Sequence, residues 1–194
     1  DPQVQIDLID TAEAYQAAEP RMVGDALLLS YDSGILIPGR VLERLTRPAY
    51  IFLAAPPTYP GRDPYHFAIY DGATHYGATV HEMIARVDAG PIVAVEEFAV
   101  GASDGPADLL ARSRDLLERL FESLAPAFVS GAAIPRLDRA WGPRKTTRAM
   151  FRSMCDLPPD ITAEEFERRY RAFDGGSWNN LTLTLHGRRF RIEK

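Results

Sequence analysis

The sequence contains few of the residues that cross-link a small protein or bind a metal ion. Its 194 residues include a single cysteine, Cys155, which excludes an internal disulfide and fits a reducing, cytoplasmic setting. The four histidines are scattered without the spacing of metal ligands, so we expect no metal site. No apolar run is long enough to cross a membrane, and no signal peptide is visible. We therefore expect neither a metal nor a membrane among the partners of this chain.

Basic residues are scarce in the first two thirds of the chain. Residues 1–135 carry 9 Lys and Arg against 19 Asp and Glu, a net charge of −10. Residues 136–194 carry 13 against 8, a net charge of +5, which gives −5 for the whole chain. Because nucleic acids need a basic footprint, we expect no nucleic-acid partner. We interpret the basic tail as a solvated face, with an anionic substrate or a partner chain as open alternatives.

Short apolar segments alternate with helical ones through the predicted main domain, residues 1–135. The alternation predicts an α/β fold: a Rossmann-like open, mostly parallel sheet with helices on both faces. The chain starts at Asp1 without a methionine, which leaves open whether this domain is complete at its N-terminus. The expected strands are Val4–Ile9, Asp25–Ser30, Tyr50–Leu53, Ala78–Met83 and Ile92–Val100; the expected helices are Thr11–Ala18, Pro38–Leu45, Asp63–Tyr70 and Pro106–Ser130, the last with Ser103 or Asp104 as cap and Gly131 as stop.

The remainder, residues 136–194, forms a small appendix. Residues 136–160 are predicted to be a proline-punctuated connector. A capping box at Thr162–Glu165 predicts a helix, and period-two alternation over residues 180–192 predicts a β-hairpin. A helix and a hairpin are too small to stand alone, so we expect them to dock on the main domain or on a second subunit. A homodimer through the hairpin is one such arrangement.

The stretch Ala49–Val93 combines two strand ends with two loops rich in glycine and proline. Such loops facing one another describe a ligand crevice at the edge of an open α/β sheet. Three motifs in it, Pro57–Pro64 (PTYPGRDP), Tyr76–His81 (YGATVH) and Val87–Val93 (VDAGPIV), resemble the folate-dependent formyltransferase family, most nearly its sugar N-formyltransferase branch. The resemblance covers roughly Asp25 to Ser130 well and the tail more loosely.

The resemblance implies a cofactor, an acceptor and their contacts. The cofactor would be 10-formyltetrahydrofolate, and the acceptor a small-molecule amine such as a nucleotide-linked amino sugar. The pterin would rest on two turns, with cofactor contacts at Tyr31, Gly34, Ile35, Leu36, Ile84, Ala85, Val87 and Asp88. Acceptor contacts would lie at Phe52, Ala54 and Tyr59.

The catalytic positions implied by the resemblance are only partly filled. Family members place Asn-x-His on the strand and Asp in the Asp-x-Gly-Pro turn; here the turn has Asp88, but the strand has Ile51 and Leu53. Formyl transfer needs hydrogen-bond donors for an oxyanion and a group that takes the proton of the amine. Residues at i and i+2 of a strand share a face, so Ile51 and Leu53 keep the geometry without the chemistry. We also expect Asp88 to lack a cationic partner.

Three interpretations remain open from the sequence. The chain is an active formyltransferase that uses His66 or His81, of which His81 is the supporting residue near the motif. It is a non-catalytic relative that binds folate or a partner protein. In the third interpretation it is a scaffold whose pocket is filled because Ile51 and Leu53 extend the core. The openness of the crevice and the binding of a folate distinguish these hypotheses.

Overall fold

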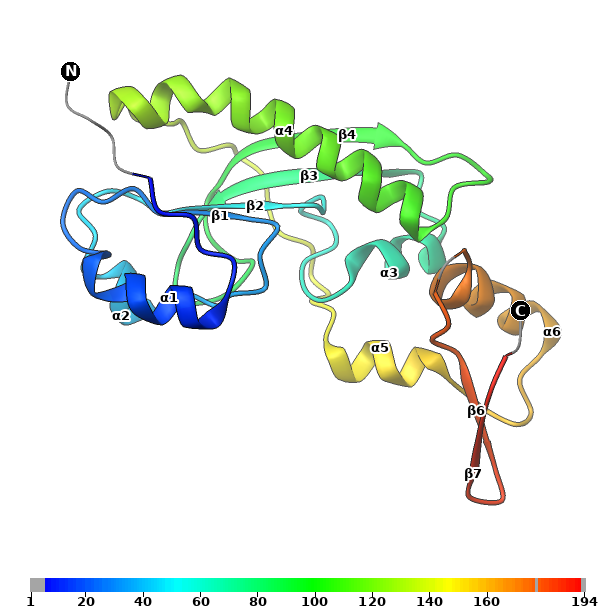
Figure 1. Cartoon of the computed structure of the whole chain (residues 1–194). Coiled ribbons are helices and arrows are strands. Elements are labelled where there is room, and N and C mark those ends of the chain that lie inside the picture. The colour runs from blue at the N-terminus through cyan, green and yellow to red at the C-terminus, as the bar shows by residue number, and fades with distance from the viewer. Residues whose placement is uncertain (1–5, 177, 193–194) are drawn as a thin grey trace.

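A computed structural model describes residues 6–176 and 178–192 of the chain. Figure 1 shows the body of the protein on the left and the C-terminal elements at the lower right. The body contains α1 (Ala12–Ala18), the 3-10 turn η1 (Glu19–Arg21), β1 (Leu29–Tyr31), α2 (Gly39–Leu42), β2 (Tyr50–Leu53), α3 (Pro64–Asp71), β3 (His75–Glu82), β4 (Ile92–Ala99) and α4 (Pro106–Ser130). The C-terminal part contains α5 (Arg148–Cys155), β5 (Asp156–Leu157), α6 (Ala163–Arg169), the π-helical turn η2 (Tyr170–Asp174), β6 (Thr182–Leu185) and β7 (Arg188–Arg191).

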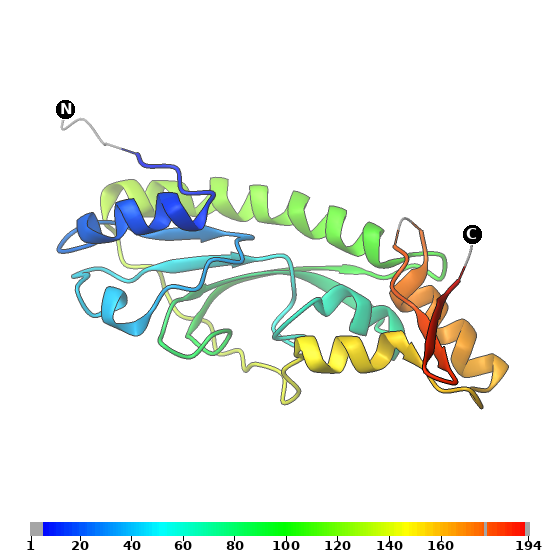
Figure 2. The ribbon, with the colours of Figure 1, turned by 60° about the horizontal axis from the view of Figure 1, so that its bottom comes forward.

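The body is an open sheet in the order β1-β2-β3-β4 between helices. Helix α4 runs along one face and α2 lies on the other (Figures 1 and 2). The predicted α/β class, the open sheet, the helices on both faces and the C-terminal helix and hairpin are confirmed. Within the described sheet the pairing is mixed: β1 and β2 are parallel, whereas β3 is antiparallel to both β2 and β4. The expected parallel pairing is thus found at β1 and β2, and the short connection between β3 and β4 makes that pair a hairpin.

Helix α4 is the longest element and has the predicted bounds. Its buried positions from Leu109 through Ser113 to Leu116, Leu117 and Leu120 recur every three or four residues, and the last three leucines pack with residues of β2 and β3. Its cap differs from the prediction, because Gly105 is the N-cap and the Asp108 carboxylate accepts from the Gly105 amide at 2.8 Å. Asp104 instead accepts from the amide of Gly101. Among the described residues, none of the helices combines the length and the apolar character that crossing a membrane demands.

The first predicted strands are shorter than expected. Val4 and Gln5 lie outside the described residues, and the rest of that predicted strand, residues 6–9, has no regular structure. Its alternating Ile6 and Leu8 are exposed, so the apolar pattern there has no sheet to pack against. The strand predicted at Asp25–Ser30 is reduced to β1, which pairs only where β2 lies beside it.

The predicted connector contains structure that the sequence interpretation missed. Helix α5 begins after Thr147, whose hydroxyl accepts from the Met150 amide at 3.2 Å, and β5 follows it directly. Strand β5 pairs in parallel with β6, which turns the predicted hairpin of β6 and β7 into a three-stranded sheet. The predicted Thr162 cap is confirmed, because its hydroxyl accepts from the Glu165 amide.

The C-terminal part docks on the body through one shared apolar cluster. Its buried members from the body are Ala55, Phe67, Ala68, Ile69, Tyr76 and Leu109, and those from the C-terminal part are Cys155, Leu157, Ala172, Phe173 and Leu181. All are buried, and Phe173 is fully so. Of the two docking arrangements expected from the sequence, the structure therefore shows the one within a single chain.

Candidate functional site

Strand β2 presents its side chains alternately to two different surroundings. Tyr50 and Phe52 point towards α4 and are buried against Phe128, with ring centroids 5.2 and 6.2 Å apart. Ile51 and Leu53 lie on the opposite face and are half-buried. The two positions that the family motif singles out thus share one face of the sheet, as their i and i+2 spacing requires.

The predicted acceptor contacts are not gathered on the face of Ile51. Phe52 is fully buried beneath α4, and Ala54 is buried in the same cluster, where its carbonyl accepts from the Tyr76 hydroxyl at 3.1 Å. Tyr59 is half-buried, with its ring 6.3 Å from that of Tyr76, and burial raises the pKa of its hydroxyl. The side chains of Phe52 and Ala54 therefore belong to the core.

Asp88 joins the loop after β3 to the proline-rich loop after β2. Its Oδ2 accepts from the amide of Gly61 at 2.9 Å, and its side chain is 8% exposed. The Nζ of Lys145 lies 4.0 Å from the same oxygen and donates to the carbonyl of Val87 at 2.5 Å. The expectation that Asp88 lacks a cation was therefore wrong. No local signal in the sequence connects Lys145 to this loop, because the two lie far apart in the chain.

Three aspartates with a left-handed backbone lie in the connections around this region. Asp32 follows β1 with φ 44°, Asp63 precedes α3 with φ 51°, and Asp88 has φ 46°. Asp32 also accepts from the Nε of Arg114 at 2.8 Å. Asp tolerates this conformation better than most residues, and such backbone positions gather at functional loops.

His81 lies on the same face of the sheet as Ile51 and directly opposite it in the register of β2 and β3. It is 2% exposed, and its ring meets that of Trp141 edge to face at 4.9 Å. Its Nδ1 lies 2.6 Å from the carbonyl oxygen of Glu82, whereas its Nε2 is buried and has no hydrogen-bond partner. Burial lowers the pKa of His81, so the ring is neutral at pH 7.

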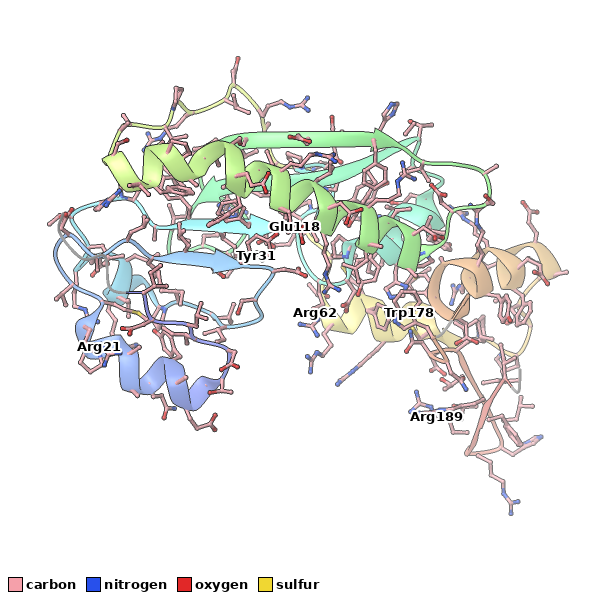
Figure 3. All side chains as sticks on the ribbon, turned by 45° about the horizontal axis from the view of Figure 1, so that its top comes forward. Arg21, Tyr31, Arg62, Glu118, Trp178 and Arg189 are labelled. Atoms are coloured by element: carbon pink, nitrogen blue, oxygen red, sulfur yellow. The ribbon has the colours of Figure 1, made fainter. Side chains whose placement is uncertain are left out.

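His66, the other histidine considered for catalysis, faces the C-terminal part instead. It lies on α3, its Nδ1 is 2.6 Å from the carbonyl oxygen of Ala172, and its ring stacks on Phe173. Trp178, labelled in Figure 3, meets the same ring edge to face. Burial lowers the pKa of His66. The structure thus gives His66 a packing position and separates it from Ile51.

The predicted cofactor contacts come from two loops, and helix α2, which follows the first loop, approaches the second. A Cβ placed on Gly39, where α2 begins, would be 3.1 Å from the Cβ of Ala85. Several of the predicted contacts are large apolar side chains exposed by two fifths or more: Tyr31, Leu36, Ile84 and Val87. Tyr31, at the end of β1 in Figure 3, stacks on Phe52 at 5.5 Å and so leans towards α4. Gly34 and Ile35 complete the first loop, which is less buried than the strands.

The largest cavity that we describe, about 800 Å³, lies at the other end of β2. It opens between Tyr50, Glu82 and the loop that follows α4. Three of its four charged side chains are engaged within the chain: Arg136 holds Glu82 through two hydrogen bonds, and Arg47 donates to the carbonyl of Phe128. We therefore place the candidate site at the loops beside Ile51 and Asp88 and not in this cavity.

Comparisons with known proteins show the family of this chain and proteins with a similar fold. Residues 21–124 match the model of the formyl transferase family, and the chain belongs to that family. The fold is similar to that of a 4-N formyltransferase from Francisella tularensis (TM-score 0.77, 20% identity, 91% of this chain and 74% of that one). It is also similar to a candidate sugar N-formyltransferase from Mycobacterium tuberculosis (TM-score 0.76, 23% identity, 100% and 84%). An N-formyltransferase from Helicobacter canadensis, in complex with folinic acid and dTDP-3-aminofucose, is similar with a TM-score of 0.64 at 15% identity (82% and 58%).

The chemistry available at the site follows from these positions. Asp88 supplies a buried carboxylate with a cation beside it, and His81 supplies a neutral imidazole. Ile51 and Leu53 supply neither a donor nor a titratable group. No group of three or more potential metal ligands occurs among the residues that the structure describes.

Proposed function

We propose that the surface formed by the loops of residues 31–36 and 84–88 binds 10-formyltetrahydrofolate. Family membership and the folinic acid bound by the Helicobacter canadensis neighbour support this cofactor. Exposed Leu36, Ile84 and Val87 offer an apolar surface, which suits a flat ring system.

The acceptor that we propose is the amine of a nucleotide-linked amino sugar. The single observation in its favour is the likeness to sugar N-formyltransferases, one of which binds a dTDP-linked amino sugar. In such a transfer the formyl carbon forms a bond to the acceptor nitrogen and breaks its bond to the folate nitrogen. Asp88, held by Gly61 and Lys145, is the residue of this chain that we place at the reacting centre.

We infer that binding is retained while turnover is strongly reduced. Each hydrogen-bond donor missing from an oxyanion site lowers the rate by about 10²–10³. Ile51 and Leu53 provide no hydrogen-bond donor at either strand position. His81 does not supply the missing donors, because it is buried and does not contact a ligand directly. A non-catalytic, folate-binding member of the formyltransferase family is the form of function that this arrangement favours.

Calorimetric titration with folinic acid tests the binding site. We expect binding by the unchanged chain and its loss in Leu36→Glu and Ile84→Glu, which place a charge on the apolar loops. Val129→Glu is the control, because Val129 is also an exposed apolar residue but lies at the far end of α4. Absence of binding by the unchanged chain would contradict the proposal and favour a filled pocket. Equal losses in all three variants would indicate a general effect of the charge.

We also propose a homodimer through the hairpin of β6 and β7. This hairpin exposes Leu185 and Phe190, and all of β7 is exposed. Light scattering after size exclusion should give twice the chain mass, and Phe190→Arg should give the monomer. Leu8→Arg, at an exposed apolar residue of the body, is the control that should leave the dimer intact. A monomeric unchanged chain would overturn this assembly.

A further inference from the structure

Two buried polar atoms without a partner flank Ile51. They are the hydroxyl oxygen of Ser30 and the Nε2 of His81. The two residues are 8% and 2% exposed, respectively. Most buried polar groups in proteins have a hydrogen-bond partner, and an unsatisfied one costs about 1–3 kcal/mol. Two such atoms beside the same apolar side chain therefore require an explanation.

The register of the sheet places both atoms next to position 51. Ser30 of β1 is the partner of Ile51 in the parallel pair, and His81 of β3 is its partner in the antiparallel pair. Partnered residues on neighbouring strands point to the same face, with strands about 4.8 Å apart. Ser30, Ile51 and His81 therefore form a row across the face opposite α4, with the apolar residue in the middle.

The hydrogen-bonding character of each atom is fixed by its surroundings. A carbonyl oxygen only accepts, so the short contact with Glu82 requires that Nδ1 of His81 carries the proton. The Nε2 of the neutral ring is then an acceptor. The hydroxyl of Ser30 can donate. A side chain between them must donate to the Nε2 of His81, and an amide can do so while it also accepts from Ser30, whereas a carboxylate cannot donate.

We propose that Ser30 and His81 form a preformed cradle for a side-chain amide at position 51, which Ile51 leaves unused. The amide N–H of Asn at this position would donate to Nε2 of His81, and its oxygen would accept from the hydroxyl of Ser30. His81 is then a positioning residue, because it orients the group at position 51 and is itself too buried to touch a ligand. An amide is also the residue type that the family motif has at this position.

Position 53 is a matched control on the same strand and face. Leu53 is half-buried like Ile51, but its partner Thr79 already donates to the carbonyl of Ala55 at 2.7 Å. Strand β1 ends at Tyr31, so no residue of β1 is registered beside Leu53. Asparagine at position 53 would therefore find no unpaired buried atom on either side.

Thermal unfolding of single variants tests the cradle. We expect Ile51→Asn to melt at or above the temperature of the unchanged chain, whereas Leu53→Asn should melt at least about 3 °C lower. Ile51→Asp, similar in shape but unable to donate, should melt below Ile51→Asn. The proposal is overturned if Ile51→Asn and Leu53→Asn are equally destabilised, or if Ile51→Asn does not fold while Leu53→Asn does.

A double-mutant cycle provides a second measurement that needs no gain in stability. Ser30→Ala should be neutral or stabilising in the unchanged chain, since it removes an unpaired hydroxyl, and destabilising in the Ile51→Asn background. In ¹⁵N spectra, the unprotonated Nε2 of His81 should shift in Ile51→Asn and stay in place in Leu53→Asn. Additive mutations with an unmoved His81 signal would contradict the cradle. None of these readouts involves folate, so failure here is distinct from failure of the proposed binding function.

Discussion

The two faces of β2 differ in how completely their polar and apolar groups are matched. On the α4 face Tyr50 and Phe52 meet aromatic and aliphatic side chains, and the cluster around them is closed. On the other face Ile51 is flanked by buried polar atoms that lack partners. The first pattern is that of a core, which packing stabilises. The second is that of a site, where local mismatch is tolerated because other contacts hold the fold.

The largest effect that separates the two faces is expected from Phe52→Ala. Phe52 is fully buried among Phe121, Phe128 and Tyr31, so its truncation should lower the free energy of unfolding by about 3–5 kcal/mol. Leu53→Ala on the half-buried face should cost less than half as much. Urea unfolding at pH 7 measures both values. Equal losses would show that the two faces are equally part of the core.

The next largest effect concerns the carboxylate of Asp88, which joins the loop after β3 to the loop after β2. Asp88→Ala removes the acceptor of the Gly61 amide and places Ala in a left-handed conformation, so we expect a loss of about 1–3 kcal/mol. Asp88→Asn keeps an oxygen acceptor and tolerates this backbone, and it should lose much less stability. The same unfolding measurement decides. Similar losses for both variants would assign the effect to charge and not to the hydrogen bond.

The core face could be predicted from the sequence far better than the site. Strand β2 and helix α4 were predicted with their observed bounds, because apolar periodicity reports directly which side chains are buried. Strand β1 was overestimated, since its pairing with β2 begins only at Leu29, although Leu27 and Leu28 before it pack against the core clusters. Helix α5 was missed although Thr147 and the spacing of Met150, Phe151 and Met154 were local signals of a capped amphipathic helix.

The surroundings of Ile51 and Asp88 could not be predicted from the sequence, because they depend on the register of the strands and on segments that lie far apart in the chain. The loops around Tyr31 and Asp88 followed from strand ends and from the family motif. That Ser30 and His81 both lie beside Ile51 follows only from the pairing of three strands. Likewise, the approach of Lys145 to Asp88 depends on how the connector packs against the loop after β3.

A smaller effect is expected from Lys145, the cation beside Asp88. Lys145→Met removes the charge 4.0 Å from Asp88 but keeps most of the aliphatic side chain. Because the Lys145 side chain is 41% exposed, solvent screens the pair, and we expect a loss of about 0.5–1 kcal/mol that shrinks in high salt. Lys145→Arg should retain most of it. Urea unfolding at low and high salt measures the difference, and a loss that is independent of salt would contradict an ionic contribution.

The smallest effect is a pH dependence of the stability that arises from His81, on the face of the sheet that carries Ile51. Burial lowers the pKa of the folded imidazole below the 6.5 of the unfolded chain. As the pH falls through 6.5, the imidazole of the unfolded chain therefore binds a proton more readily than that of the folded chain. The contribution of His81 to the free energy of unfolding is complete above pH 6.5, and it is lost as the pH falls from there to the pKa of the folded chain. Between pH 7 and pH 6 the loss from one such histidine is at most about 0.7 kcal/mol.

Urea unfolding of the unchanged chain and of His81→Phe at both pH values isolates this contribution. The change in stability between the two pH values should be smaller in His81→Phe, whatever its absolute stability. His66 is equally buried and its pKa is also lowered, so His66→Phe should remove a second, separate part of the slope. An unchanged slope in His81→Phe would mean that the folded chain protonates this imidazole as readily as the unfolded chain does, so that burial does not disfavour its charged form. The Nε2 would then be free to take up a proton, and the asymmetry between the two faces of β2 would need a different chemical explanation.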